Sequence, residues 1–191
     1  MNCWKEINLT KQYGTQRVCI LSIITMLFTF ILLYVPANYL FVPSTLEDNY
    51  FLFLIAALWL MYPIHKIIHF FSLVHLKNKI KKTFKIKYLV MPVIQIQIIE
   101  PISKWQYILT LILPFILING FLFTACWIFN NYVHYFTILL AFHIGLCVSD
   151  FIYIKNVLKA PNRAYIEENE NGFEILVNHP NLNNHNETFL H

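Results

Sequence analysis

Long runs of apolar residues alternate with shorter polar segments along this chain of 191 residues. Four runs are long enough to cross the hydrocarbon core of a bilayer, which takes about 20 helical residues. They cover residues 18–35, 50–74, 107–129 and 132–154, and the first of them stops at Pro36. The pattern predicts an all-α membrane protein with four transmembrane helices.

Lysine and arginine mark alternate connections between these runs. They precede the first run, fill the connection between the second and the third, and follow the fourth, whereas the other two connections contain none. Cytoplasmic loops of membrane proteins carry this excess of basic residues. We therefore expect a multi-pass protein of the cell membrane with both termini and the central loop in the cytoplasm.

The polar segments contain a different pattern, in which polar and apolar residues alternate as in a half-buried strand. In the central loop, residues 85–90 and 94–99 alternate in this way, and Pro92 between them fits a turn or an edge position. After the fourth run, residues 164–168 and 173–177 flank Asn171-Gly172, a pair that favours a hairpin. We expect a small cytoplasmic β-layer made of the central loop and the C-terminal hairpin.

Composition supports the membrane interpretation. Hydrophobic residues make up 58% of the chain and charged residues 13%, against about 45–50% and about 25% in soluble domains. We expect residues 1–177 to form one integral membrane domain in contact with the lipid bilayer. Residues 178–191 are polar and rich in asparagine, which predicts a flexible tail.

The remaining composition says little about partners. The lysines between residues 77 and 87 are explained by topology and by contact with anionic lipid, so nucleic-acid binding is not expected. The four cysteines have no paired spacing, which argues against a disulfide framework or a zinc knuckle, and those in apolar runs are expected to be small buried residues. The oligomeric state is not predicted.

Ionisable residues inside the second and fourth runs are the candidate functional groups, because such residues are costly in a membrane. His65 and His69 are four residues apart, so both project from one face of a helix, the spacing by which two histidines bind one metal ion. Asp150 lies at a similar depth on the fourth helix. Two histidines and a carboxylate with an open fourth position form a known catalytic zinc arrangement. The sequence thus indicates a zinc site formed by His65, His69 and Asp150.

Two other interpretations remain open at this point. The histidines could simply form hydrogen bonds within the helix bundle, and Asp150 could pair with Lys66 as a buried ion pair. His143 lies seven residues before Asp150 and shares its helix face. It is either a packed polar residue, which we favour, or a partner that supports a ligand.

These motifs resemble a family of bacterial membrane proteins called putative zincin peptidases, or domain of unknown function 3267. His65-Lys-Ile-Ile-His69 resembles the helix that carries HExxH in that family, and Gly145-Leu-Cys-Val-Ser-Asp150 is similar to its second motif. The likeness extends from about residue 50 to residue 177. It implies that His65, His69 and Asp150 are zinc ligands in a site-2-type metalloprotease, with the cytoplasmic strands binding a peptide or membrane-protein segment.

Lys66 departs from that family pattern. Such peptidases need a glutamate directly after the first histidine, which takes a proton from the attacking water and passes it to the leaving amine. An ammonium group cannot act as this base, although it could extend to the interface. We therefore expect a degenerate or non-canonical member that keeps its metal site. The alternatives are an active peptidase with another base, such as Glu100 or Glu167, and a non-metal scaffold or small transporter.

Overall fold

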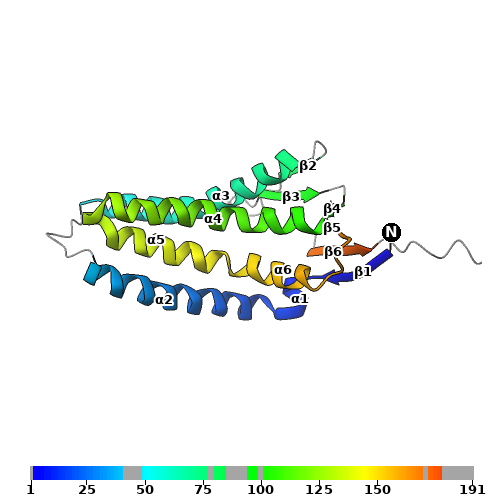
Figure 1. Cartoon of the computed structure of the whole chain (residues 1–191), viewed down its shortest axis with the longest axis horizontal. Coiled ribbons are helices and arrows are strands. Elements are labelled where there is room, and N and C mark those ends of the chain that lie inside the picture. Colours follow the sequence, from blue (N-terminus) through cyan, green and yellow to red (C-terminus); the bar gives the residue numbers. More distant parts are fainter. Residues whose placement is uncertain are drawn as a thin grey trace, which may run out of the picture.

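The computed structural model describes residues 2–40, 49–76, 80–84, 94–98, 101–169 and 172–177. Within them the chain is mostly helical, and the helices run side by side along the long axis of the molecule (Figure 1). The helices are α1 (Leu9–Tyr13), α2 (Thr15–Leu40), α3 (Phe51–Leu76), α4 (Lys104–Ile128), the 3-10 turn η1 (Asn130–Tyr132), α5 (Val133–Leu146) and α6 (Val148–Leu158).

Among the described residues, four helical spans are long and apolar enough to cross a membrane, as the sequence predicts. They are Thr15–Ala37, Phe51–Leu73, Lys104–Ile128 and Asn130–Leu158. Two features of these spans differ from the prediction by more than a shift of their ends. The first helix does not end at Pro36 but continues to Leu40, since membrane helices tolerate proline where neighbouring groups satisfy the freed backbone. The fourth span is not one helix, because Cys147 separates α5 from α6.

The strands gather at one end of the helix bundle (Figure 1). One antiparallel sheet has the order β1 (Asn2–Ile7), β6 (Gly172–Val177), β5 (Ala164–Asn169) and β4 (Ile102–Ser103). A second sheet pairs β2 (Ile80–Phe84) with β3 (Ile94–Ile98). The C-terminal hairpin and the strand at 94–98 are confirmed, while the strand predicted at 85–90 and the tail 178–191 lie outside the described residues. The sequence pattern did not reveal β1, β2 and β4.

The predicted C-terminal hairpin pairs β5 with β6. Asn169 pairs with Gly172, which begins β6, and residue 171 lies outside the described residues. Gly172 has a φ of 158°, and a Cβ atom there would overlap the carbonyl oxygen of Ile7 on β1. Glycine is therefore needed for the close approach of β1, because any side chain would push that strand away.

Two apolar clusters of buried side chains divide the interior along the bundle axis. The cluster at the strand end combines sheet residues such as Phe173 and Ile175 with Leu73 of α3 and Ile154 of α6. The other cluster fills the far half of the bundle and includes Met61 of α3. On α3, His65 and His69 lie between Met61 and Leu73, so a buried polar layer separates the two clusters.

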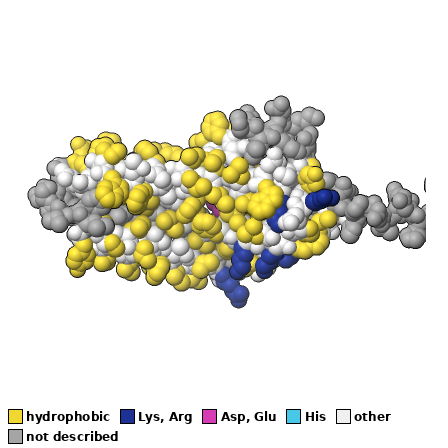
Figure 2. Space-filling model, in the orientation of Figure 1, with side chains coloured by type: hydrophobic (Ala, Val, Ile, Leu, Met, Phe, Trp, Pro, Cys, Tyr) yellow, Lys and Arg dark blue, Asp and Glu magenta, His cyan; other side chains and the backbone are white. Residues whose placement is uncertain are grey.

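The outer surface of the bundle is apolar. Large hydrophobic side chains of α2, such as Ile24, Phe28 and Ile31, are more than half exposed. Figure 2 shows hydrophobic side chains over the length of the bundle and lysine and arginine side chains near the strand-bearing end. Burial of this surface in lipid removes the hydrophobic cost of exposing it to water. The chain is thus a multi-pass membrane protein.

Candidate metal centre

Side chains from α3 and α6 converge in the polar layer between the two clusters. His65 and His69 lie one turn apart on α3, just after Pro63, and Asp150 lies in the first turn of α6. Their potential ligand atoms are close: His65 Nε2 is 3.1 Å from His69 Nε2 and 3.1 Å from Asp150 Oδ2. His69 Nε2 is 3.5 Å from the same oxygen. Three candidate metal ligands therefore surround one point.

All three residues are buried, with relative exposures of 3%, 7% and 5% in chain order. Asp150 Oδ2 is nevertheless without a hydrogen-bond partner of acceptable geometry among the described residues. A buried carboxylate oxygen without a donor is costly. The arrangement indicates that something other than a protein donor satisfies this oxygen.

The backbone of α4 holds the Nδ1 atom of His69, the ring nitrogen that faces away from Asp150. His69 Nδ1 lies 3.0 Å from the carbonyl oxygen of Thr110, which can only accept, so Nδ1 carries the proton and donates it. The Ser72 hydroxyl donates to the Thr110 hydroxyl at 3.2 Å and ties the same two helices together. His69 Nε2 therefore turns an unprotonated lone pair toward Asp150, the tautomer that a metal ligand requires.

A longer chain of hydrogen bonds holds His65. His65 Nδ1 lies 3.1 Å from Nε2 of His143, and His143 Nδ1 lies 3.0 Å from Oδ1 of Asn119. Because this amide oxygen accepts, His143 donates from Nδ1, and its Nε2 accepts a hydrogen bond from Nδ1 of His65. His65 Nε2 is then also unprotonated and points at the same place as His69 Nε2.

This arrangement fits a divalent cation better than a set of hydrogen bonds. Two lone pairs 3.1 Å apart repel each other unless a proton or a cation lies between them. Ligands at about 2.0–2.1 Å from a tetrahedral zinc ion would lie about 3.3 Å apart, and the three observed separations are 3.1, 3.1 and 3.5 Å. The donor set and its spacing therefore suit zinc.

Lys66 takes no part in this cluster. The ion pairs of Asp150 within the described residues are with the two histidines, not with Lys66. The amine of Lys66 instead lies 6.0 Å from the ring centroid of Tyr62. Of the two candidate replacement bases, Glu100 is outside the described residues and Glu167 lies in β5 opposite Glu174.

The sequence model of the putative zincin peptidases matches residues 58–165, a segment that includes every candidate ligand. The chain belongs to the putative zincin peptidase family. Comparisons with curated proteins and with solved structures gave no match. The family segment begins within α3 and ends in β5, so it contains the polar layer together with the helices that support it.

Several groups around this candidate site were not identified as functional from the sequence. His143, for which a packed polar residue was favoured, lies against His65 and is fully buried. Asn119 and the Thr110 carbonyl gave no sequence signal, because they lie on α4, which has no ionisable residue near the site. Cys147 is buried as expected, but it also lies 3.7 Å from His143 Nε2. Its spacing of four from His143 was the available clue.

Proposed function

We propose that this protein is a degenerate zincin-type membrane protein that holds a zinc ion through His65, His69 and Asp150 without ordinary peptidase activity. The observation that carries the proposal is the buried Asp150 Oδ2, which faces two histidine lone pairs and has no protein donor among the described residues. The hydrogen bonds from His65 and His69 to neighbouring helices support it, since they orient both imidazoles as ligands.

The residue that follows the first histidine argues against ordinary proteolysis. Zinc at this position would supply Lewis acidity toward a peptide carbonyl. The chain must supply the proton transfer, and Lys66 stands where a general base is needed. Its ammonium group cannot accept a proton, and loss of a general base costs about 10²–10⁴-fold in rate. Binding of a membrane-protein or peptide segment without cleavage is the function that fits this combination.

The placement of charge supports a cytoplasmic position for the strand-bearing end and for both termini, in a protein of the cell membrane. Arg17 lies in the first turn of α2 and Lys155 in the last turn of α6, both at that end. A substrate segment would meet the sheets there and could add a strand to an open edge. A membrane-impermeant thiol reagent tests the orientation: Cys3 should react only after the cells are permeabilised.

Metal analysis of the purified, detergent-solubilised chain tests the zinc site. Wild type should carry close to one zinc per chain. In a Cys147→Ser background, which removes the thiol near His143, His69→Ala and Asp150→Asn should each lose it. His134→Ala is the matched control, because it removes a histidine from α5 outside the cluster. Wild-type protein that is purified without chelator and carries less than about a tenth of a zinc ion per chain would contradict the proposal.

A gain-of-function variant tests the claim of degeneracy. Lys66→Glu restores the family's general base beside His65 and should create cleavage of a labelled unstructured protein such as casein, absent from wild type and dependent on zinc. Lys66→Gln controls for removal of the positive charge alone. Cleavage by wild type that Lys66→Glu does not improve would favour an active peptidase with an unusual base.

A further inference from the structure

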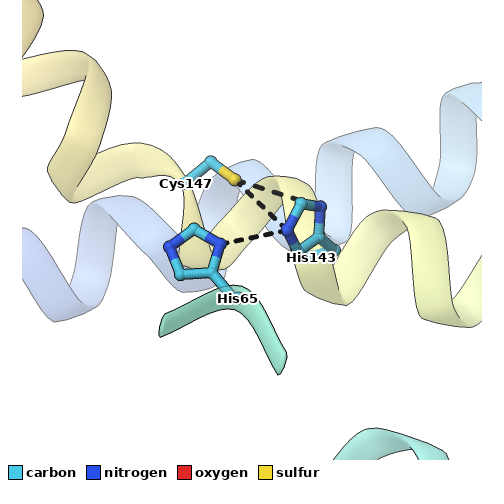
Figure 3. Close-up of side chains that lie close together, drawn as sticks. All are labelled: His65, His143 and Cys147. Carbon is cyan, nitrogen blue, oxygen red and sulfur yellow. Dashed lines mark hydrogen bonds between the residues drawn. The ribbon is translucent and has the colours of Figure 1, made fainter. Parts of the chain in front are cut away.

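A second group of metal-ligating side chains lies on the other side of His65. Figure 3 shows His65 from α3, His143 from α5 and Cys147 from the junction of α5 and α6, with the two histidine rings and the thiol turned toward one another. His65 Nδ1 is 3.1 Å from His143 Nε2, and Cys147 Sγ is 3.7 Å from that same nitrogen. All three ligand atoms lie within 4.8 Å of one another.

Burial distinguishes this group from a chance surface cluster. His143 and Cys147 are 0% and 1% exposed, so their polar atoms are shielded from solvent. Cys126 provides a contrast, since it is equally enclosed in the bundle but belongs to no such group among the described residues. Burial alone therefore does not bring a cysteine into a ligand cluster here.

The donor set favours soft cations. Two imidazole nitrogens and one thiolate carry a total charge of −1, the same as two imidazoles and one carboxylate. Thiolate ligands prefer Cu⁺ and Zn²⁺, and by the same softness Cd²⁺, over harder ions. Zinc–nitrogen and zinc–sulfur bonds of about 2.0 and 2.3 Å place such ligands about 3.3–3.6 Å apart. The nitrogen–nitrogen and nitrogen–sulfur separations here are 3.1 and 3.7 Å.

We propose that His65 Nδ1, His143 Nε2 and Cys147 Sγ form a second, thiophilic metal position that competes with the His65/His69/Asp150 position for His65. A neutral imidazole offers only one unprotonated nitrogen. Cation binding here breaks the Cys147 S–H bond and releases its proton. It also moves the His65 proton from Nδ1 to Nε2, which lies 3.1 Å from the negatively charged Asp150 Oδ2. His65 is then lost to the first position.

The competition rests on the proposed function, whereas the existence of the second position does not. A cation in the second position would remove His65 from the ligands of the first position. Exposure to a soft metal would therefore weaken zinc binding at the first position. The tautomer of His65 decides which position holds a cation. Both positions lie in the polar layer between the two apolar clusters.

Cobalt and cadmium provide the probe, because thiolate ligation produces a near-ultraviolet charge-transfer band that nitrogen and oxygen ligands do not. The full chain is prepared with Cys147 as its sole thiol, by substituting serine for the others, Cys3, Cys19 and Cys126. Asp150→Asn in this background weakens the first position. The intensity of the thiolate–cobalt band should then correspond to one cobalt ion per chain. Further substitution of Cys147→Ser should abolish the band, and His143→Leu should weaken cobalt binding by about 10–100-fold.

Competition is measured with Asp150 intact. The apparent Kd for Cd²⁺, read from its thiolate band, should rise in proportion to added zinc. Binding of zinc and cadmium together, at two ions per chain, would overturn the competition. No thiolate band in Asp150→Asn protein that retains its circular dichroism spectrum would overturn the second position itself.

The two proposals can fail separately. Zinc that is bound by wild type and lost in His69→Ala, without any thiolate band, leaves the proposed function standing and removes the second position. A thiolate band in Asp150→Asn protein, with no zinc bound by a Cys147→Ser variant that keeps Asp150, leaves the second position and removes the first.

Discussion

Two helical glycines provide a matched test of how closely α2 packs against the helix that carries His143. A Cβ atom on Gly145 of α5 would lie 3.0 Å from Cβ of Met26 and 3.1 Å from the carbonyl oxygen of Ser22, both on α2. A Cβ atom on Gly120 of α4 would meet nothing within 4 Å. We predict that the same Gly→Ala substitution acts in opposite directions at the two positions.

The magnitude follows from two terms. Alanine improves helix propensity by up to about 1 kcal/mol at either site. At Gly145 the added methyl group also overpacks the contact, and the backbone oxygen on α2 has little freedom to yield, which costs about 1–3 kcal/mol. Because the propensity term is shared, the difference between the two variants isolates the steric cost. We expect Gly120→Ala to be neutral or stabilising and Gly145→Ala to be less stable than Gly120→Ala by about 1–3 kcal/mol.

The assay is reversible unfolding of the purified chain in mixed micelles titrated with SDS, followed by circular dichroism. The free energies of unfolding of wild type and of both alanine variants are compared in the same micelles. Equal stability of the two variants, within about 0.5 kcal/mol, would refute the close approach of α5 to α2. A larger side chain, Gly145→Val, should extend the loss if the contact is steric.

Three further predictions concern single side chains. Lys104, which is 3% exposed, donates to two carbonyl oxygens at and just beyond the end of α6, at 3.0 and 2.6 Å, so Lys104→Met should lower the unfolding free energy by about 1–3 kcal/mol in the same titration. Partial burial and then the charge of Glu174 raise the pKa of Cys3, so its thiolate forms only at higher pH than that of a free cysteine. Iodoacetamide should therefore modify Cys3 slowly at neutral pH and faster in Glu174→Gln, and a rate equal to that of free cysteine would contradict this. His143→Leu should weaken zinc binding by about 10–100-fold, and His143→Gln, whose amide oxygen can accept the same hydrogen bond, should restore much of it in a competition titration with a chelator.

The sequence alone predicted the features that depend on local pattern. The length of each apolar run predicts a membrane span, because a helix must cover the hydrocarbon core to satisfy its backbone groups. The spacing of His65 and His69 predicts a shared helix face in the same local way. The alternating residues of β3 and of the C-terminal hairpin predict strands, because side chains in a strand point to opposite sides in turn. The position of Lys66 in the family motif is likewise read directly from the chain.

The tertiary structure alone decided which side chains meet across helices. His65 Nδ1 contacts His143, which is 78 residues away, and His143 in turn contacts Asn119 of α4. In a membrane helix nearly every face is apolar, so hydropathy does not reveal how each helix is rotated, and close packing of small residues such as Gly145 sets that rotation instead. The pairing of β1 with β6 is similarly non-local. The four spans were therefore predictable because the bilayer requires long apolar helices. The two candidate ligand clusters around His65 depend on how the helices pack against one another.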